Sequence, residues 1–236
     1  MRLSAAFIAI SSMFTLACMG GDKLGRGDDT ASPDDSGDGD GDGVVAGGLC
    51  GEYAGVEGVG TRWEYDYNDG QGTTGPYVVE VTAIDGKDVE LVTTLNIEGT
   101  TFTQDSTTTS QYRCGDEGMV LLSSYNFYTV VASNYEYDGW TDTTYTNGAL
   151  VLPRTLTLGT SWVSDQTNTY TDSNGGDDGS SLSYTFEVTA EEDVNVPAGA
   201  YTTLRVETVD VPGVSHYAKG VGFVKTSYFQ LTRYSK

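Results

Sequence analysis

The sequence predicts an all-β domain of antiparallel meander type, and three observations indicate it. From Cys50 onward, Val, Thr and Tyr dominate short runs in which polar and apolar residues alternate, as in half-buried strands. Turn sequences rich in Gly, Asp and Pro separate these runs. Hardly any stretch shows the 3.6-residue periodicity of an amphipathic helix. We therefore expect residues 49–236 to form a single β domain.

The expected strands follow one another in order along the chain. The first spans residues 62–67, where charged and aromatic residues alternate. Residues 77–84 and 88–95 flank Asp85-Gly86-Lys87, a turn of the hairpin type. Further strands are predicted at residues 101–104, 106–113, 118–124, 127–136, 140–146, 159–171, 181–193, 201–210, 214–218 and 222–234.

Glycine and proline mark two bends between the later strands. Pro197-Ala198-Gly199 predicts a turn between two long strands, because proline already holds the backbone angle that the turn needs. Gly220 and Gly222 predict a bulge or a tight bend just before the last strand.

Two parts of the predicted domain repeat a similar plan. Gly60-Thr-Arg-Trp63 opens a polar and aromatic strand, and a Val/Thr strand follows at residues 79–83. Gly159-Thr-Ser-Trp162 opens another, and a Val/Thr strand follows at residues 186–190. This repetition favours a single sheet that curls on itself.

Residues 1–17 are typical of a bacterial lipoprotein signal peptide. Arg2 precedes a short uncharged apolar run, which ends in Thr15-Leu16-Ala17-Cys18. This ending resembles the lipobox, so we expect cleavage before Cys18 and attachment of diacylglycerol to its sulfur. An ordinary signal peptide with a chance cysteine is the alternative. Met19 follows rather than an aspartate, which favours the outer membrane over retention at the inner one.

Residues 18–48 are predicted to be an acidic, disordered tether. Gly, Asp and Ser dominate, and such a segment cannot bury enough apolar surface to order itself. A Gly-rich coil of this length has a root-mean-square span of about 30 Å. Asp38, Asp40 and Asp42 resemble half of a calcium loop, but position 12 falls on Leu49 instead of a glutamate. We therefore predict no metal site.

Two cysteines remain once Cys18 is assigned to lipidation. Cys50 and Cys114 leave an even number in an exported chain, which predicts a disulfide. Such a loop would contribute roughly 4 kcal/mol by the chain-entropy model. Two unpaired thiols are the alternative.

Composition excludes several functional classes. A formal net charge of −22 argues against binding to nucleic acid or to anionic lipid surfaces. No apolar run reaches the ~18–20 residues that a membrane-spanning helix needs. His216 is the only imidazole, and no G-x-S-x-G motif accompanies it. We expect no enzymatic activity and no cofactor, and a hydrolase ranks last among the hypotheses.

Three motifs resemble a group of exported bacterial lipoproteins with paired G-x-x-W segments. They are P-x-x-L-x-x-G-x-x-W from Pro153 to Trp162, V-P-A-G-x-Y from Val196 to Tyr201, and the run from Tyr217 to Lys225. The segment from Gly58 to Tyr65 is similar to that group's first half, and the resemblance covers most of residues 55–234. The group is similar in plan to the lipoprotein-localisation-factor fold. The resemblance implies an incomplete β-barrel whose concave side holds acyl chains, although a shared fold does not transfer function.

Aromatic residues supply the candidate binding positions. Tyr65, Tyr128, Tyr137, Trp140 and Tyr217 are candidates for lining a ligand site. Packing in the core and between neighbouring strands is the alternative for each of them.

The sequence therefore predicts a non-enzymatic, lipid-anchored envelope protein. Its curved sheet would bind a hydrophobic ligand or a partner protein. A structural or surface adhesion module without a small-molecule ligand is the alternative.

Overall fold

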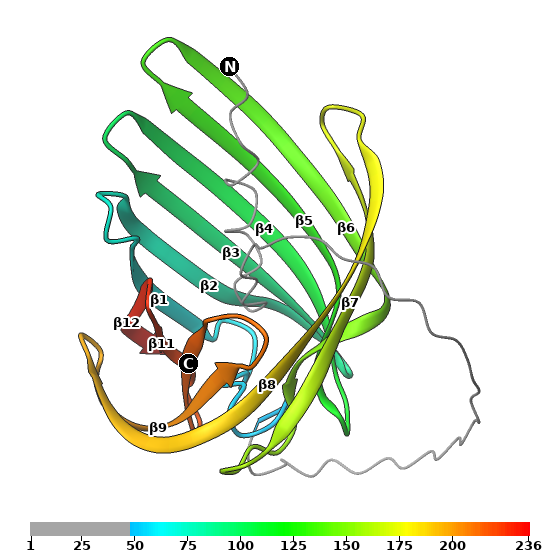
Figure 1. Ribbon diagram of the computed structural model, residues 1–236, viewed down its shortest axis with the longest axis vertical. Helices are drawn as coiled ribbons and strands as arrows, with labels where there is room; N and C mark the ends of the chain where they lie inside the picture. The colour runs from blue at the N-terminus through cyan, green and yellow to red at the C-terminus, as the bar shows by residue number, and fades with distance from the viewer. Residues whose placement is uncertain (1–47) are drawn as a thin grey trace.

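The computed structural model describes residues 48–236, and these residues form a closed barrel of twelve antiparallel strands without a helix (Figure 1). The all-β prediction is confirmed. The expected signal peptide, the lipidated Cys18 and almost all of the expected tether lie outside the described residues. The strands are β1 (Arg62–Asn68), β2 (Thr74–Asp85), β3 (Asp88–Glu98), β4 (Phe102–Cys114), β5 (Gly118–Ala132), β6 (Tyr135–Pro153), β7 (Ser161–Asp172), β8 (Asp177–Val196), β9 (Gly199–Thr208), β10 (Val214–Ala218), β11 (Gly222–Thr226) and β12 (Phe229–Ser235).

The sheet closes, so the expectation of an incomplete barrel is wrong. Each strand pairs with its neighbours along the chain, and β1 pairs with β12 over most of its length. Aromatic rings pack beside this seam: the Trp63 and Tyr234 centroids are 5.8 Å apart, and those of Tyr67 and Phe229 are 5.1 Å apart. The alternation of residues in β1 and β12 is the same whether or not these strands pair, so the sequence pattern alone could not indicate closure.

Strand length gives the barrel an uneven rim. The long strands β3 to β6, which we call the wall, rise well beyond the short strands β10 to β12 (Figure 1). β8 is the longest strand, with 20 residues, and its two parts pair with different neighbours. Its first part pairs with β7 and its second part with β9, so it curves beneath the wall. The wall therefore exposes a broad outer face.

Several expected strands have different bounds in the structure. The segments predicted at 101–104 and 106–113 form one strand, β4, which stays regular along most of its length. The segment predicted at 127–136 runs across the turn between β5 and β6. The last predicted strand is two strands, because the Thr226 hydroxyl accepts the backbone N–H groups of Tyr228 and Phe229 and stabilises a turn.

The two G-x-x-W segments form the same local structure. Gly60 and Gly159 both adopt positive φ, 89° and 84°. In each segment one valine forms two backbone hydrogen bonds of 2.8–2.9 Å with the turn: its carbonyl accepts from the glycine N–H, and its N–H donates to the carbonyl of the following threonine. The valine is Val81 in the first segment and Val188 in the second. In each, the threonine hydroxyl also accepts a backbone N–H three residues earlier. The repetition in the sequence is therefore a repetition of a turn that starts a strand.

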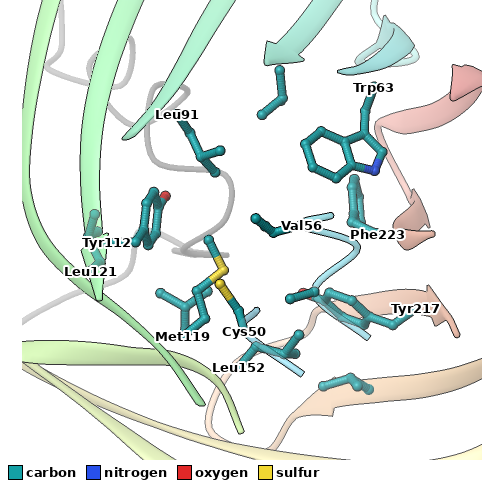
Figure 2. Close-up of a cluster of buried hydrophobic side chains, with 14 of the residues drawn as sticks. Cys50, Val56, Trp63, Leu91, Tyr112, Met119, Leu121, Leu152, Tyr217 and Phe223 are labelled. Carbon is teal, nitrogen blue, oxygen red and sulfur yellow. The ribbon is translucent and has the colours of Figure 1, made fainter. Parts of the chain in front are cut away.

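Residues 48–58, which we call the plug, pack into one end of the barrel. Ala54 and Val56 are buried there among core side chains of the strands (Figure 2). The backbone approach is close, since a Cβ on Gly55 would lie 2.2 Å from the Val221 carbonyl oxygen. Gly222 adopts a φ of 93° at the same contact, so the predicted bend at this glycine is confirmed. We call this end of the barrel the plugged end.

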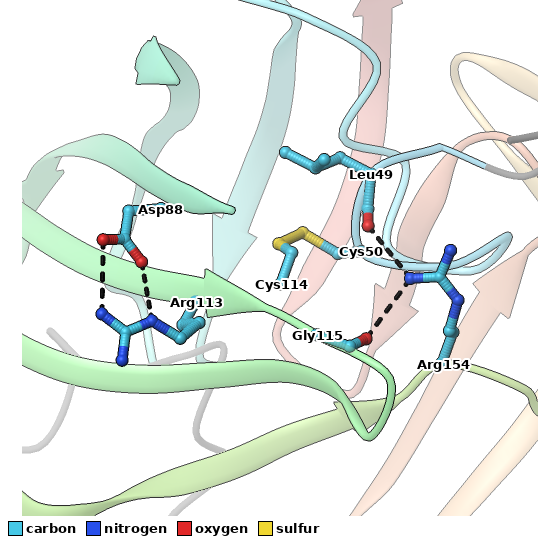
Figure 3. Close-up of a disulfide and its surroundings, with 7 residues drawn as sticks. All are labelled: Leu49, Cys50, Asp88, Arg113, Cys114, Gly115 and Arg154. Atoms are coloured by element: carbon cyan, nitrogen blue, oxygen red, sulfur yellow. Dashed lines mark hydrogen bonds and ion pairs between the residues drawn. A yellow bond between two sulfur atoms is a disulfide. The ribbon is translucent and has the colours of Figure 1, made fainter. Parts of the chain in front are cut away.

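A disulfide and an arginine fix the plug to the wall. Cys50 is bonded to Cys114 at the end of β4, with Cα atoms 4.6 Å apart, so the predicted pairing is confirmed. Arg154 Nη1 donates to the carbonyls of Leu49 and Gly115 at 3.4 and 3.3 Å (Figure 3). The point where the described chain begins is therefore tied to the centre of the sheet.

Candidate interaction surface

The inner face of the barrel changes from apolar to polar away from the plugged end. On β4, the inward side chains run from Tyr112 near the plug to Ser106 and Gln104 farther up the strand, and all three are buried. On β7, the buried inward residues Ser164 and Gln166 follow Trp162 in the same way. An acyl chain gains little from hydroxyl and amide groups. These strands therefore line the interior with groups that suit polar contacts.

Two of the five candidate aromatic residues are core residues. Tyr65 is 1% exposed, and its hydroxyl donates to the Phe223 carbonyl at 2.9 Å. Tyr217 is buried nearby with its ring against Phe223, and burial raises the pKa of Tyr217 to about 12. Both rings pack between strands, as the alternative reading of these residues expected.

Tyr128 and Tyr137 lie together on the inner face, where they connect two hairpins. Their ring centroids are 6.0 Å apart. The Tyr128 ring covers its cross-strand partner Gly139, where a Cβ would lie 2.4 Å from the ring. The Tyr137 hydroxyl bonds to Ser173 and Asn174 in the turn between β7 and β8. Burial raises the pKa of Tyr128 to about 12, whereas the hydrogen bonds to Ser173 and Asn174 lower the pKa of Tyr137.

Trp140 lies on the opposite, outer face of the wall. It pairs with Phe127 across β5 and β6, and its ring stacks on Tyr125 with a centroid distance of 6.3 Å. Val131 continues this face, and Tyr125, Phe127 and Val131 are each between 42% and 44% exposed. We call Tyr125, Phe127, Val131 and Trp140 the aromatic strip. The structure thus brings the candidates together in two pairs, Tyr65 with Tyr217 around Phe223 and Tyr128 with Tyr137 on the inner face, and places Trp140 apart from both.

Carboxylates border the aromatic strip. Because directly paired residues of antiparallel strands share a face, Asp142 lies beside Tyr125, and Glu136 lies beside Val131. Asp105 and Asp138 flank Thr129 on β4 and β6, and the Thr129 hydroxyl donates to Asp138 at 2.7 Å. The outer face therefore carries rings and acids in one continuous array.

A pocket adjoins this array on the β4 side. It has a volume of about 510 Å³ and lies over the far ends of β2, β3 and β4. Asp105 belongs both to the pocket and to the border of the aromatic strip. Glu98 and Asn96 supply further polar lining. Sequence analysis missed this pocket, because it depends on the register of three strands.

Lys and Arg are absent from strands β5 to β8, which include the two strands that carry the aromatic strip. Between Arg113 and Arg205 the only Lys or Arg is Arg154, which binds the plug. The acids of these four strands lie on β6, β7 and β8, and β5 has no charged residue. The net charge of these four strands is therefore negative.

The described residues show no arrangement typical of a metal site, and His216 is engaged in a structural contact. Between residues 48 and 236, no group of three or more His, Cys, Asp and Glu side chains could hold a metal ion. His216 Nε2 lies 2.7 Å from the Glu192 carboxylate. The same part of the chain contains no helix long and apolar enough to cross a membrane.

Comparisons with protein-family models, with curated proteins and with solved structures found no match. The resemblance to exported lipoproteins therefore remains an expectation from the motifs.

Proposed function

We propose that this protein is a non-enzymatic, lipid-anchored envelope protein that binds a partner protein through the aromatic strip. One observation carries the proposal: Tyr125, Phe127 and Val131 are large apolar side chains left exposed side by side, next to Trp140. Aromatic residues are enriched where proteins bind one another. Contiguous exposed apolar patches on a folded protein mark interaction sites.

The interior of the barrel is a poorer site for a hydrophobic ligand than the aromatic strip is for a partner protein. At the plugged end, the space between the strands is filled by side chains such as Trp63, Tyr65 and Val56. Farther up, the inward positions of β4 and β7 are polar. Of the two expected binding partners, a hydrophobic ligand and a partner protein, we therefore propose the protein.

The expected lipid anchor and tether fit this role. A diacylated Cys18 would hold the chain at a membrane, and the segment up to residue 48 would give it a reach of about 30 Å. The disulfide and Arg154 then attach that segment firmly to the barrel. Anchoring and binding would thus use different ends of the molecule.

Site-specific photo-crosslinking in cells tests the proposal. The full-length protein is produced with a photoreactive amino acid at Phe127, and at Tyr228 as a control, because Tyr228 is also exposed but lies in the turn between β11 and β12. We expect a discrete protein adduct from position 127 and none from position 228. Absence of an adduct at positions 125, 127 and 131 alike would overturn the proposed function.

Lipid extraction addresses the competing ligand. Protein purified from the envelope with its anchor intact is extracted after removal of detergent, and lipids other than the anchor are counted by mass spectrometry. We expect none in stoichiometric amount. One bound lipid per barrel would favour the interior as the binding site.

A further inference from the structure

We infer that the partner contacts the aromatic strip through a basic segment, a stretch of chain rich in Lys or Arg that lies across the outer face of the wall. This inference rests on the proposed function and specifies the chemistry of the partner. It is carried by the charges around the strip, which are a separate observation from the exposed rings.

The carboxylates beside the strip have no cationic partner within residues 48–236. Asp105, Glu136, Asp138 and Asp142 form no ion pair there, and Thr129 is the hydroxyl donor to Asp138. The ion pairs of the described chain join residues of other surfaces, as Arg62 joins Glu80 on β1 and β2. Several acids near the plugged end, such as Glu80 and Asp88, pair with an arginine, whereas those around the strip do not.

The spacing of acids and rings suits cationic side chains. Across the three strands the outward positions read Thr109, Tyr125 and Asp142 in one row, and Thr107, Phe127 and Trp140 in the next. The third row contains Asp105, Thr129 and Asp138, and the fourth contains Thr103, Val131 and Glu136. A guanidinium or ammonium group can stack on an aromatic face while a neighbouring carboxylate accepts its hydrogen bonds.

The adjoining pocket adds further carboxylates to those that border the aromatic strip. Glu98 and Asp105 both line it, and Asp105 also stands in the third row of the array. The volume of about 510 Å³ is large enough for a long side chain to enter. A basic segment could therefore place one cation in the pocket and others over the rings.

Charge also decides between the other occupants of this face. A second copy of the chain would bring the same acidic strands, and like charges facing each other are repelled. An acyl chain would leave the bordering carboxylates without a favourable contact. A neutral glycan could stack on the rings but, having no charge, would gain little electrostatic attraction from the carboxylates. A basic segment can contact both the exposed rings and the carboxylates that border them.

A binding titration with defined peptides tests the inference. The full-length mature protein, held in detergent micelles, is titrated with a nonaarginine peptide and with a nonaglutamate peptide of equal length. Trp140 reports binding by fluorescence, since Trp63 and Trp162 are buried. We expect saturable one-to-one binding of nonaarginine only, weakened by roughly tenfold or more as salt rises from low to physiological concentration.

Substitutions test whether nonaarginine binds at the aromatic strip and its bordering carboxylates. Asp138→Asn with Asp142→Asn, and separately Phe127→Ala, should each weaken nonaarginine binding by about fivefold or more, as expected for losing charge-assisted and cation–π contacts. The matched control, Asp66→Asn with Asp116→Asn, removes two exposed acids elsewhere and should change the affinity less than twofold. Circular dichroism checks that each variant is folded.

Three outcomes would overturn the inference. They are no binding of nonaarginine, an equal loss in the control variant, and equal binding by the Asp138→Asn/Asp142→Asn variant. Binding of maltohexaose that depends on Phe127 but not on the acids would assign the strip to a glycan instead. The photo-crosslinking experiment distinguishes this inference from the proposed function. If the adduct at position 127 persists in the Asp138→Asn/Asp142→Asn variant, the aromatic strip still binds a partner, but the partner does not contact it through a basic segment.

Discussion

At the scale of single residues, the two tryptophans of the repeated G-x-x-W segments hold equivalent places but have different partners. Trp63 is 1% exposed, and its Nε1 donates to the Val221 carbonyl at 2.6 Å. Trp162 stacks on Phe186, with centroids 5.2 Å apart, and its buried Nε1 has no hydrogen-bond partner in the described chain. A buried donor without a partner contributes less to stability than one that is bonded.

We therefore predict that Trp63→Phe destabilises the protein more than Trp162→Phe does. Trp63→Phe loses a hydrogen bond that also satisfies a carbonyl, and should lower the free energy of unfolding by about 2 kcal/mol. Trp162→Phe removes a donor that has no partner, and should cost roughly 1 kcal/mol less. Urea denaturation of both variants measures the difference, and equal losses would contradict this account.

At the scale of elements, the plug is held by a covalent and a polar contact to different strands. The disulfide reaches the end of β4, and Arg154 follows directly after β6. Between them, the plug backbone also accepts a hydrogen bond from Gly220 N–H at the turn between β10 and β11. The plug thus connects parts of the barrel that are far apart in sequence.

Removing the disulfide should destabilise the barrel without changing its fold class. The double variant Cys50→Ala/Cys114→Ala opens a loop with a sequence separation of 64, for which the chain-entropy model gives about 4 kcal/mol. Urea denaturation with and without reductant measures the effect. Reductant should shift the wild-type midpoint to that of the variant and leave the variant unchanged. A wild-type midpoint that is insensitive to a strong reductant would contradict the prediction.

The β5–β6 hairpin shows how far the candidate site could be predicted. An aromatic cluster at residues 125–140 is visible in the sequence, and its members do lie on two paired strands. The strand predicted at 127–136 crosses the real turn at Ser133 and Asn134, however, so it could not assign a face to Tyr128. Since a shift of one residue exchanges the two faces of a strand, the face follows only from the position of the turn.

At the scale of the whole molecule, the strand content and the disulfide followed from sequence, whereas closure did not. Alternation in β1 and β12 is local, but their pairing joins residues near both ends of the described chain. Such contacts depend on the accumulated twist of all the intervening strands, which no single motif encodes. The pocket near Asp105 depends on that same long-range register.

Buried tyrosines distributed around the barrel predict cooperative unfolding in alkali. Burial raises the pKa of Tyr77 and Tyr217 to about 12, and raises the pKa of Tyr65 and Tyr112 above the usual value near 10. A raised phenol pKa means that the folded state keeps its proton longer than the unfolded chain. This stability is complete below about pH 10 and is lost as the pH rises through about 12.

Urea denaturation at increasing pH, with tyrosinate absorbance recorded in parallel, measures this loss. Each buried tyrosine contributes up to about 1.4 kcal/mol per pH unit within that window. Tyr77→Phe should make the decline less steep, whereas Tyr228→Phe, at an exposed ring, should leave it unchanged. A free energy of unfolding that stays constant up to pH 12 would contradict the prediction.

The bond between Cys50 and Cys114 also determines how the barrel responds to mechanical force. A pull on the chain ahead of residue 48 passes through this bond into β4 before it reaches β1. Without the bond, the same tension would act on β1 from one end, and strands could be peeled away in sequence. With it, the tension acts first on β4, which is paired along its length with both β3 and β5. The disulfide should therefore make the barrel harder to unfold by a pull from its N-terminal side.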